Sequence, residues 1–170
     1  MEHRNAEPHL NARNLAQISG SQLTALASLR VAQDQEDLGG TFETSVNEWQ
    51  VANADQILGL AFYLETEPVG IVLLKRFGLS PSWVPDEAVS LHGLKIAEGL
   101  QRRGFGREAF GLAIDAAKAR WPSAKQLILA VDAGNEPALA VYRGFGMLDS
   151  GPIFEGRIGF EHRLQLEFQQ

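Results

Sequence analysis

Three arginines crowd around two glycines in the segment "QRRGFGREAF", which begins at Gln101. Gly104 and Gly106 lack a Cβ atom, so the chain can turn tightly there and bring backbone N–H groups close to a ligand. The residues that follow have helical spacing, and a helix start adds unpaired N–H donors and a positive dipole end. Full positive charges come from three side chains: Arg102, Arg103 and Arg107. The segment therefore predicts a site for a phosphate or pyrophosphate group.

The tetrapeptide "RGFG" of this segment occurs a second time at 143–146, and the residues flanking the two copies do not align. A structural repeat would extend beyond four letters, so each copy needs its own explanation. Before the second copy, Asn135, Ala138 and Tyr142 fall at i, i+3 and i+7 and share one face of a predicted helix. The glycines of the second copy end that helix. A helical tyrosine is more often a packing residue, but a phenol on this face is also a candidate proton donor.

The elements that must position these residues can be read from apolar periodicity and turn residues. Strands are expected at 14–18, 56–66, 67–77, 88–97, 126–131 and 157–168. Helices are expected from Ser21 onward, around 44–49, over 104–119 and from Asn135 onward. The order β-α-α-β-β-β-α-β-α-β predicts a single α/β domain over 14–170, after a mobile N-terminal leader over 1–13.

Composition restricts the class of protein further. The chain has 170 residues and no cysteine, which removes disulfides, thiolate metal sites and cysteine nucleophiles and fits a cytoplasmic location. Its apolar runs are too short to cross a membrane, and its polar N-terminus is unlike a secretory signal. A net charge of −6 argues against general nucleic-acid binding.

The charges are unevenly distributed along the chain. Residues 31–74 hold eight acids and neither lysine nor arginine, whereas residues 95–143 hold eight basic residues against five acids. One part of the molecule is therefore expected to favour a cation and another an anion, unless the asymmetry is only that of a solvated surface.

The two motifs together resemble those of the GNAT superfamily of acyl-CoA-dependent N-acetyltransferases. The stretch from Gln101 to Gly106 matches that family's Gln/Arg-x-x-Gly-x-Gly/Ala motif. The helix with Asn135, Ala138 and Tyr142 matches its second motif, which ends at Gly146 with Met147 in place of the usual aromatic residue. The resemblance covers roughly residues 15–168. It implies a mixed central sheet with a splayed strand pair, flanked by helices.

The resemblance also implies roles for residues of this sequence in binding acetyl-CoA. Backbone amides of the glycine turn would hold the pyrophosphate, the preceding strand would pair with the pantetheine arm, and Asn135 would contact that arm or order its helix. Tyr142 would be the general acid that protonates the departing thiolate. The residues implied in cofactor binding are Leu94, Lys95, Ile96, Gln101, Arg102, Arg103, Gly104, Phe105, Gly106, Arg107 and Asn135.

The general base is left open by the sequence. Several family members carry a glutamate at the position of Ser90. Glu87 could act through a water molecule, and His92 has a suitable intrinsic pKa, although its parity with Leu94 and Ile96 is equally that of a core-facing residue. Asp132 is a third candidate. No enzyme nucleophile is needed for direct attack by an amine, and no histidine grouping predicts a metal.

The stretch "LRVAQDQEDLGG" at 29–40 gives an indication of the acceptor amine, because it is similar to a segment of bacterial diamine and polyamine acetyltransferases. The likeness would place acidic and amide side chains beside the acceptor: Asp34, Gln35, Glu36 and Asp37, with Asp132 near them. It favours a small cationic amine such as a polyamine. The alternatives are a peptide or protein amine, an aminoglycoside, or a non-catalytic acyl-CoA-binding regulatory module. The family resemblance also makes a homodimer an expectation.

Overall fold

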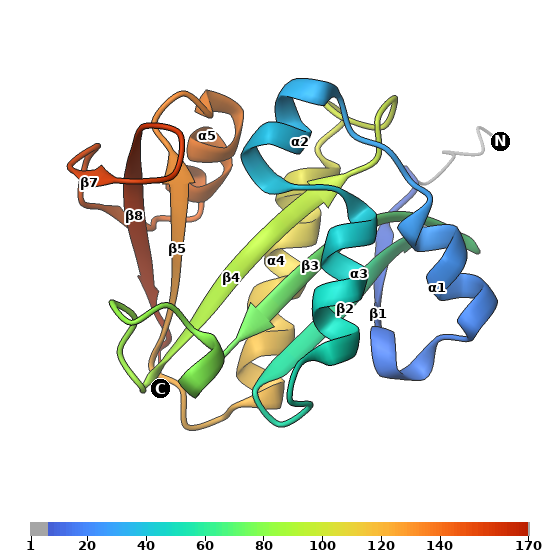
Figure 1. The fold of residues 1–170 in the computed structure, drawn as a ribbon, viewed down its shortest axis with the longest axis horizontal. Coiled ribbons are helices and arrows are strands. Elements are labelled where there is room, and N and C mark those ends of the chain that lie inside the picture. The colour runs from blue at the N-terminus through green and yellow to red at the C-terminus, as the bar shows by residue number, and fades with distance from the viewer. Residues whose placement is uncertain (1–6, 170) are drawn as a thin grey trace, which may run out of the picture.

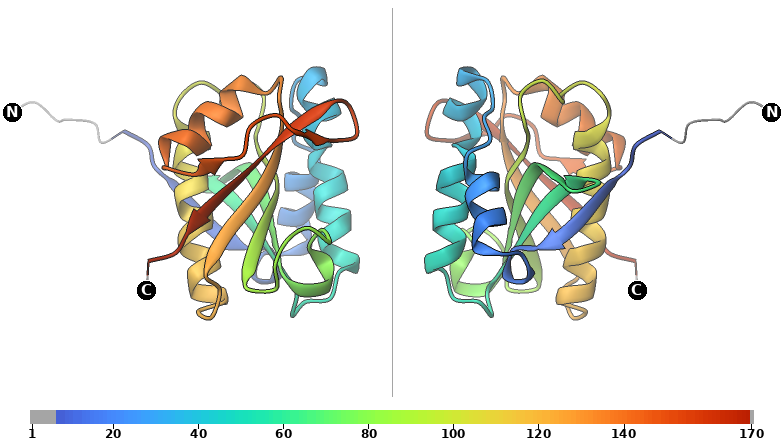
Figure 2. Two further views of the ribbon diagram at one scale, coloured as in Figure 1. Left: turned by 90° about the vertical axis from the view of Figure 1, so that its left-hand side faces the viewer. Right: turned by 90° about the vertical axis from the view of Figure 1, so that its right-hand side faces the viewer.

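A computed structural model describes residues 7–169 and shows one mixed eight-stranded sheet with helices on both of its faces (Figures 1 and 2). The strands are β1 (Leu10–Asn14), β2 (Ile57–Leu64), β3 (Glu67–Lys75), β4 (Ala88–Ile96), β5 (Gln126–Asp132), β6 (Leu148–Asp149), β7 (Phe154–Glu155) and β8 (Phe160–Glu167). The α-helices are α1 (Gly20–Ala27), α2 (Gln33–Gly39), α3 (Phe42–Val51), α4 (Phe105–Arg120) and α5 (Glu136–Gly144). Two short 3-10 helices lie at Leu15–Gln17 and Phe77–Leu79.

The sheet follows the order β1-β2-β3-β4-β5-β8-β6, and β7 pairs with β8. Neighbouring strands are antiparallel except for β4 and β5, which are parallel and are connected by α4. Helices α1 and α3 cover one face of β2 and β3, and α4 covers the other face (Figure 2). Each face therefore has its own apolar core, with Phe42 and Ile71 on the α3 side and Phe110 and Leu127 on the α4 side.

The parallel pair at the centre of the sheet separates along its length. Ala88–Ser90 of β4 pair with Gln126–Ile128 of β5, whereas β4 runs on to Ile96 and β5 to Asp132 with no further pairing recorded between them. Figure 1 shows the two strands diverging toward α2 and α5. The predicted fold class, a mixed α/β sheet with a splayed strand pair, is confirmed.

A bulge in β4 decides which of its side chains face α3. Gly93 has a φ of 60°, and the register against β3 shifts so that Leu73 pairs with His92 and Ile71 with Lys95. Because Ile71 and Leu73 belong to the core under α3, His92 and Lys95 share that face. The expectation that His92 and Ile96 face the same side of the sheet is therefore wrong, since Ile96 packs in the core under α4.

The N-terminal part of the chain differs from the prediction in three places. Leu10–Asn14 form β1 along the edge of β2, so the predicted leader does not extend over residues 10–13, and residues 1–6 lie outside the described residues. The strand expected at 14–18 is a 3-10 turn, because the Asn14 side chain accepts a hydrogen bond from the N–H of Ala16. Helix α1 is capped by Ser19, whose hydroxyl and Gln22 form a capping box, and not by Ser21.

Candidate active site

A cavity of about 950 Å³ lies where β4 and β5 separate. Its walls come from β3, β4, β5, α2, α3, α5 and the turn before α4. Most of the residues singled out in the sequence line it: Asp34, Gln35, His92, Leu94, Lys95, Ile96, Gln101, Arg102, Gly104, Gly106, Arg107, Asp132, Asn135 and Tyr142. Five other residues singled out in the sequence are not among its lining residues: Glu36, Asp37, Glu87, Arg103 and Phe105. The fold thus brings both motifs and the predicted acceptor segment to one place.

The turn between β4 and α4 has the conformation that an anion site needs. Gly104 is the N-cap of α4 in a left-handed conformation with φ 83°, and Arg102 is also left-handed with φ 61°. A Cβ atom added at Gly106 would meet no heavy atom within 4 Å, so the first turn of α4 is open toward the cavity. The backbone N–H groups at this helix start and Arg102 therefore form a cradle for a negatively charged group.

The two RGFG copies meet in the structure. The guanidinium of Arg107, just after the first copy, lies 4.9 Å from the ring centroid of Phe145 in the second copy. Phe145 in turn packs edge-on against Phe110 of α4, with the ring centroids 4.9 Å apart. This contact fixes the start of α4 against the end of α5, so the anion cradle and the tyrosine helix hold each other in place.

Helix α5 presents Tyr142 to the cavity. Asn135 caps the helix by accepting a hydrogen bond from the N–H of Ala138 at 3.3 Å, which accounts for the helix-ordering role predicted for it. Tyr142 is 6% exposed and packs edge-on against Phe110. Burial raises the pKa of Tyr142, so its hydroxyl keeps its proton at neutral pH. A protonated phenol inside the cavity is what the predicted general acid requires.

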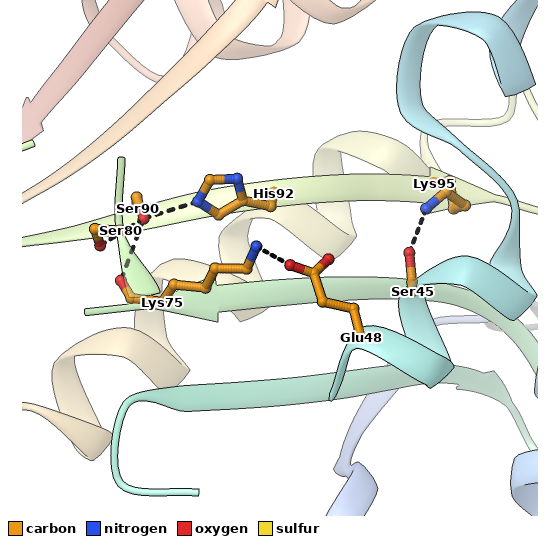
Figure 3. Close-up of polar contacts among 7 residues, drawn as sticks. All are labelled: Ser45, Glu48, Lys75, Ser80, Ser90, His92 and Lys95. Atoms are coloured by element: carbon orange, nitrogen blue, oxygen red, sulfur yellow. Dashed lines mark hydrogen bonds and ion pairs between the residues drawn. The ribbon is translucent and has the colours of Figure 1, made fainter. Parts of the chain in front are cut away.

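His92 lies in a chain of hydrogen bonds on the α3 side of the sheet (Figure 3). Its Nε2 atom is 2.8 Å from Ser90 Oγ, which is itself 2.8 Å from Ser80 Oγ. Burial, reinforced by the positive charge of Lys75, lowers the pKa of His92 to about 3. The imidazole is therefore neutral at physiological pH.

Two charged residues beside His92 were not predicted as site residues. Lys75 Nζ forms an ion pair and hydrogen bond with a carboxylate oxygen of Glu48, and both residues line the cavity (Figure 3). Nearby, Lys95 Nζ donates a hydrogen bond to Ser45 Oγ at 2.7 Å. A signal existed in the sequence, because Ser45 and Glu48 are at i and i+3 on one helix, and Lys75 directly follows the apolar run "VGIVLL".

Helix α2 is held over the cavity from two directions. The Gln35 amide donates a hydrogen bond to Gln101 Oε1 at 2.9 Å, and Gln101 also donates to the carbonyl of Ile96 at 3.0 Å. From the other direction, the Arg157 guanidinium donates to the carbonyl of Asp37. The predicted acceptor segment is therefore tied directly to the predicted cofactor motif.

The charge of the cavity is mixed rather than acidic. Of the eight acids at 31–74, only Asp34 and Glu48 line the cavity. The lining acids are Asp34, Glu48, Asp132 and Glu161, and the lining bases are Lys75, Lys95, Arg102, Arg107 and Arg157. Glu87 is exposed outside the cavity, whereas Asp132 lines it at the end of β5.

Two other kinds of functional feature are absent from the described part of the chain. Within residues 7–169, no three His, Asp or Glu side chains are grouped as metal ligands would be. No helix in this same part of the chain is long and apolar enough to cross a membrane.

A parted parallel strand pair between an anion-binding turn and a buried phenol is the arrangement that the resemblance to the GNAT superfamily implied. In agreement with this class, the model of the acetyltransferase (GNAT) family matches residues 23–147. The chain belongs to this family, and acetyl transfer is its general activity. No curated protein matches the sequence.

Solved structures share the fold over nearly the whole chain. An acetyltransferase from Thermus thermophilus matches with a TM-score of 0.67 and 20% identity, covering 94% of this chain and 97% of that one. A ribosomal-protein-alanine N-acetyltransferase from Brucella melitensis matches with a TM-score of 0.69 and 20% identity, covering 93% and 99%. A Bacillus subtilis acetyltransferase in complex with CoA matches with a TM-score of 0.61 and 18% identity, covering 94% and 99%.

Proposed function

We propose that this protein is an N-acetyltransferase that moves an acetyl group from acetyl-CoA to the primary amine of a small molecule. The observation that carries the proposal is that the buried Tyr142 and the start of α4 line the same cavity. The Bacillus subtilis neighbour, which was solved with CoA, supports CoA as the cosubstrate.

The residues present fit acetyl-CoA. The turn from Arg102 to Arg107 would hold the pyrophosphate through backbone N–H groups and arginine charge. The edge of β4 at Leu94–Ile96 has no recorded pairing with β5, so this edge can pair with the pantetheine arm. The carbonyl of Ile96 already accepts a hydrogen bond from Gln101, which leaves the backbone groups of Leu94 for that pairing. The thioester would then reach the opening between the two strands, beside Tyr142.

The chemistry needs no covalent enzyme intermediate. The amine nitrogen attacks the thioester carbonyl carbon, a C–N bond forms, and the carbonyl electrons move to oxygen. When the tetrahedral intermediate collapses, the C–S bond breaks and the thiolate takes the proton of Tyr142. The attacking nitrogen also loses a proton, which passes to Asp132 or to water, and Tyr142 recovers its proton from water. Of the predicted bases, His92 and Asp132 line the cavity, and the low pKa of His92 suits it to accept a hydrogen bond from a neutral amine rather than to carry a proton away.

A small acceptor is favoured over a protein by the contacts that hold α2 over the cavity through Gln101 and Arg157. The polyamine prediction rested on the likeness of residues 29–40 to a segment of polyamine acetyltransferases and on the acidic segment at 31–74. The presence of Lys75 and Lys95 in the cavity argues against an acceptor that carries several positive charges. Peptide amines, aminoglycosides and polyamines are therefore included as alternative acceptors in the experiment below.

The experiment is release of free thiol from acetyl-CoA with a panel of amines: polyamines, amino acids, aminoglycosides and peptides with free α-amines. Acceptor-dependent release, with the N-acetyl product detected by mass spectrometry, is the expected result. Binding of acetyl-CoA without release for any amine would support the regulatory-module alternative instead.

Other properties predicted from the sequence stay predictions. They are a cytoplasmic location, no bound metal, no association with nucleic acid or membranes, and a homodimer. Light scattering would show whether the particle in solution contains one chain or two.

A further inference from the structure

Two buried lysines share the α3 face of the sheet with a single carboxylate (Figure 3). Lys75 is 9% exposed and Lys95 is 8% exposed, and both line the cavity. Their positions follow from the register of β3 and β4, which places Lys75 opposite Ser90 and Ile71 opposite Lys95. The bulge at Gly93 is needed for this arrangement, because without it Lys95 would point toward α4.

The charges on this face do not balance. Glu48 pairs with Lys75, and the neutral His92 adds no charge, so the side chains of β3, β4 and α3 supply two ammonium groups and one carboxylate. Asp34 of α2 also lines the cavity, but among residues 7–169 no ion pair with it is recorded. Around Lys95 the cavity presents Glu48 from α3, Lys75 from β3, His92 from β4 and Asp34 from α2. Among residues 7–169, no carboxylate is recorded within 4.0 Å of Lys95 Nζ, and the hydrogen bond recorded for its three donors is the one to Ser45.

A buried ammonium that faces a cavity with one neutral partner is an unfilled anion site. Burying a charge is costly unless it is paired and hydrogen-bonded. In this protein, burial lowers the pKa of Lys95 to about 8, and the charge of Glu48 opposes that effect only in part. A ligand carrying one negative charge would give the Lys95 ammonium the charged partner that it lacks.

The missing anion is not expected to come from CoA. Its phosphates have their own cradle at the start of α4, where Arg102 and Arg107 line the cavity. The pantetheine arm that would run along β4 is uncharged, and Lys95 projects from β4 toward Ser45 of α3, on the side of the sheet away from α4. The anion therefore belongs to the second substrate.

We propose that Lys95 and Ser45 bind a carboxylate of the acceptor, so that the acceptor is an amino acid or another primary amine carrying a carboxylate. This inference rests on the proposed function and names the substrate class of the same site. A polyamine, an aminoglycoside and a simple alkylamine all lack the group that Lys95 would bind.

The test compares amino acids with the amines formed from them by decarboxylation, in the pairs ornithine and putrescine, lysine and cadaverine, and phenylalanine and phenethylamine. Each pair differs by the carboxylate alone. For at least one pair we expect kcat/KM to be about 10- to 100-fold higher for the amino acid, as a charged hydrogen-bonded contact would provide. Equal or better use of the decarboxylated member in every pair would overturn the proposal.

Substitution of Lys95 tests whether its side chain, rather than another part of the cavity, causes the preference for the amino acid. In Lys95→Met, which keeps the length of the side chain without its charge, the preference within a pair should disappear through a higher KM for the amino acid. The kcat/KM of the decarboxylated amine in the same variant is the reference, so that any effect of the substitution on acetyl-CoA cancels in the ratio within a pair. Lys118→Met is the matched control, because Lys118 is on α4 and is not among the lining residues. Ser45→Ala should show a smaller loss, of about threefold to tenfold, in the same direction.

A binding measurement distinguishes failure of this inference from failure of the proposed function. Isothermal titration of each pair into the protein saturated with CoA reports acceptor binding without turnover. Binding of the amino acids that is lost in Lys95→Met supports the carboxylate site even if no thiol is released. If amines are acetylated but neither binding nor KM depends on Lys95, the acetyltransferase function stands and the carboxylate site is wrong.

Discussion

Tyr142 is the residue on which the proposed chemistry depends most directly. Replacing it with phenylalanine removes the proton donor but leaves the ring that packs against Phe110. Tyr142→Phe should therefore bind acetyl-CoA with an unchanged Kd and lose about 10²- to 10⁴-fold in kcat, the usual contribution of a general acid. Titration calorimetry and steady-state thiol release measure the two quantities.

The chain offers a matched control for this substitution, because it has two tyrosines. Tyr63 is also fully buried, but it lies in the core under α3, and its hydroxyl has no hydrogen-bond partner among the described residues. Tyr63→Phe should leave both kcat and Kd unchanged. Full turnover in Tyr142→Phe would remove Tyr142 from the mechanism.

Lys95 makes a prediction about pH that does not depend on the acceptor losing a proton. Its pKa is about 8, so below that pH the ammonium is charged and attracts a carboxylate, and above it the neutral amine does not. The inhibition constant of valerate, a carboxylate without an amine, should therefore rise as the pH increases through about 8. His92, with a pKa of about 3, stays neutral over this range.

Valerate keeps its charge from about pH 6 to pH 10, so the protein is the titrating partner. In Lys95→Met the inhibition constant should be high at every pH. A wild-type constant that does not change between about pH 7 and pH 9 would show that Lys95 does not bind the carboxylate.

At the scale of single elements, the two glycines of the turn before α4 should respond to alanine in opposite ways. Gly104 has a left-handed φ of 83°, so Gly104→Ala should lower the free energy of unfolding by about 1–2 kcal/mol through backbone strain. Gly106 lies in the first turn of α4 with open space around it. Gly106→Ala should raise the free energy of unfolding by about 0.5–1 kcal/mol. Urea denaturation measures both changes.

The same pair of variants tests where the pyrophosphate binds. A methyl group at Gly106 would stand on the open surface at the start of α4, so it should weaken acetyl-CoA binding although it stabilises the fold. We expect a rise of roughly tenfold in Kd, as for the loss of one close contact of about 1.4 kcal/mol. An unchanged Kd in Gly106→Ala would mean that the pyrophosphate lies elsewhere.

The elements also show which parts of the fold a sequence can predict. Helix α4 was predictable because Phe105, Ala109 and Ala113 form a buried stripe. Helix α2 has no buried residue and therefore no stripe, so its stretch of acids was indistinguishable from a loop. The face of the sheet to which His92 points was predicted wrongly, because a bulge at Gly93 breaks the two-residue period of β4. A single glycine in the sequence does not indicate such a shift.

At the scale of the whole molecule, the motifs proposed to bind the cofactor were predictable, whereas the residues proposed to bind the acceptor were not. The anion cradle and the Tyr142 helix are local motifs, each complete within about ten residues. The Lys75–Glu48 pair and the Lys95–Ser45 contact join β3, β4 and α3 across 27 and 50 residues of sequence. Such pairs depend on register and helix packing, which composition does not contain. The acidic excess at 31–74 was misleading for the same reason, since most of those acids do not line the cavity.

The site as a whole predicts how acetyl-CoA should change the motions of the molecule. The halves of the sheet on either side of the opening are joined by three residue pairs, Ala88–Ser90 with Gln126–Ile128. A ligand held at the start of α4, along the end of β4 and beside α5 would connect the two halves again. At a concentration of 100 times its Kd it would also stabilise the native state by about 2.7 kcal/mol.

Hydrogen exchange measured with and without acetyl-CoA would show this connection. We expect slower exchange in the first turn of α4, at Leu94–Ile96 and in α5, because backbone N–H groups there gain partners or lose access to water. Exchange in α1, which lies away from the opening, should not change beyond the effect of global stabilisation (Figure 1). The comparison should be repeated with Gly106→Ala at the same degree of saturation, where protection of α4 should fall while that of α5 persists. Protection confined to α2 and α3 would place the ligand on the acceptor side and contradict the binding of the thioester between the parted strands.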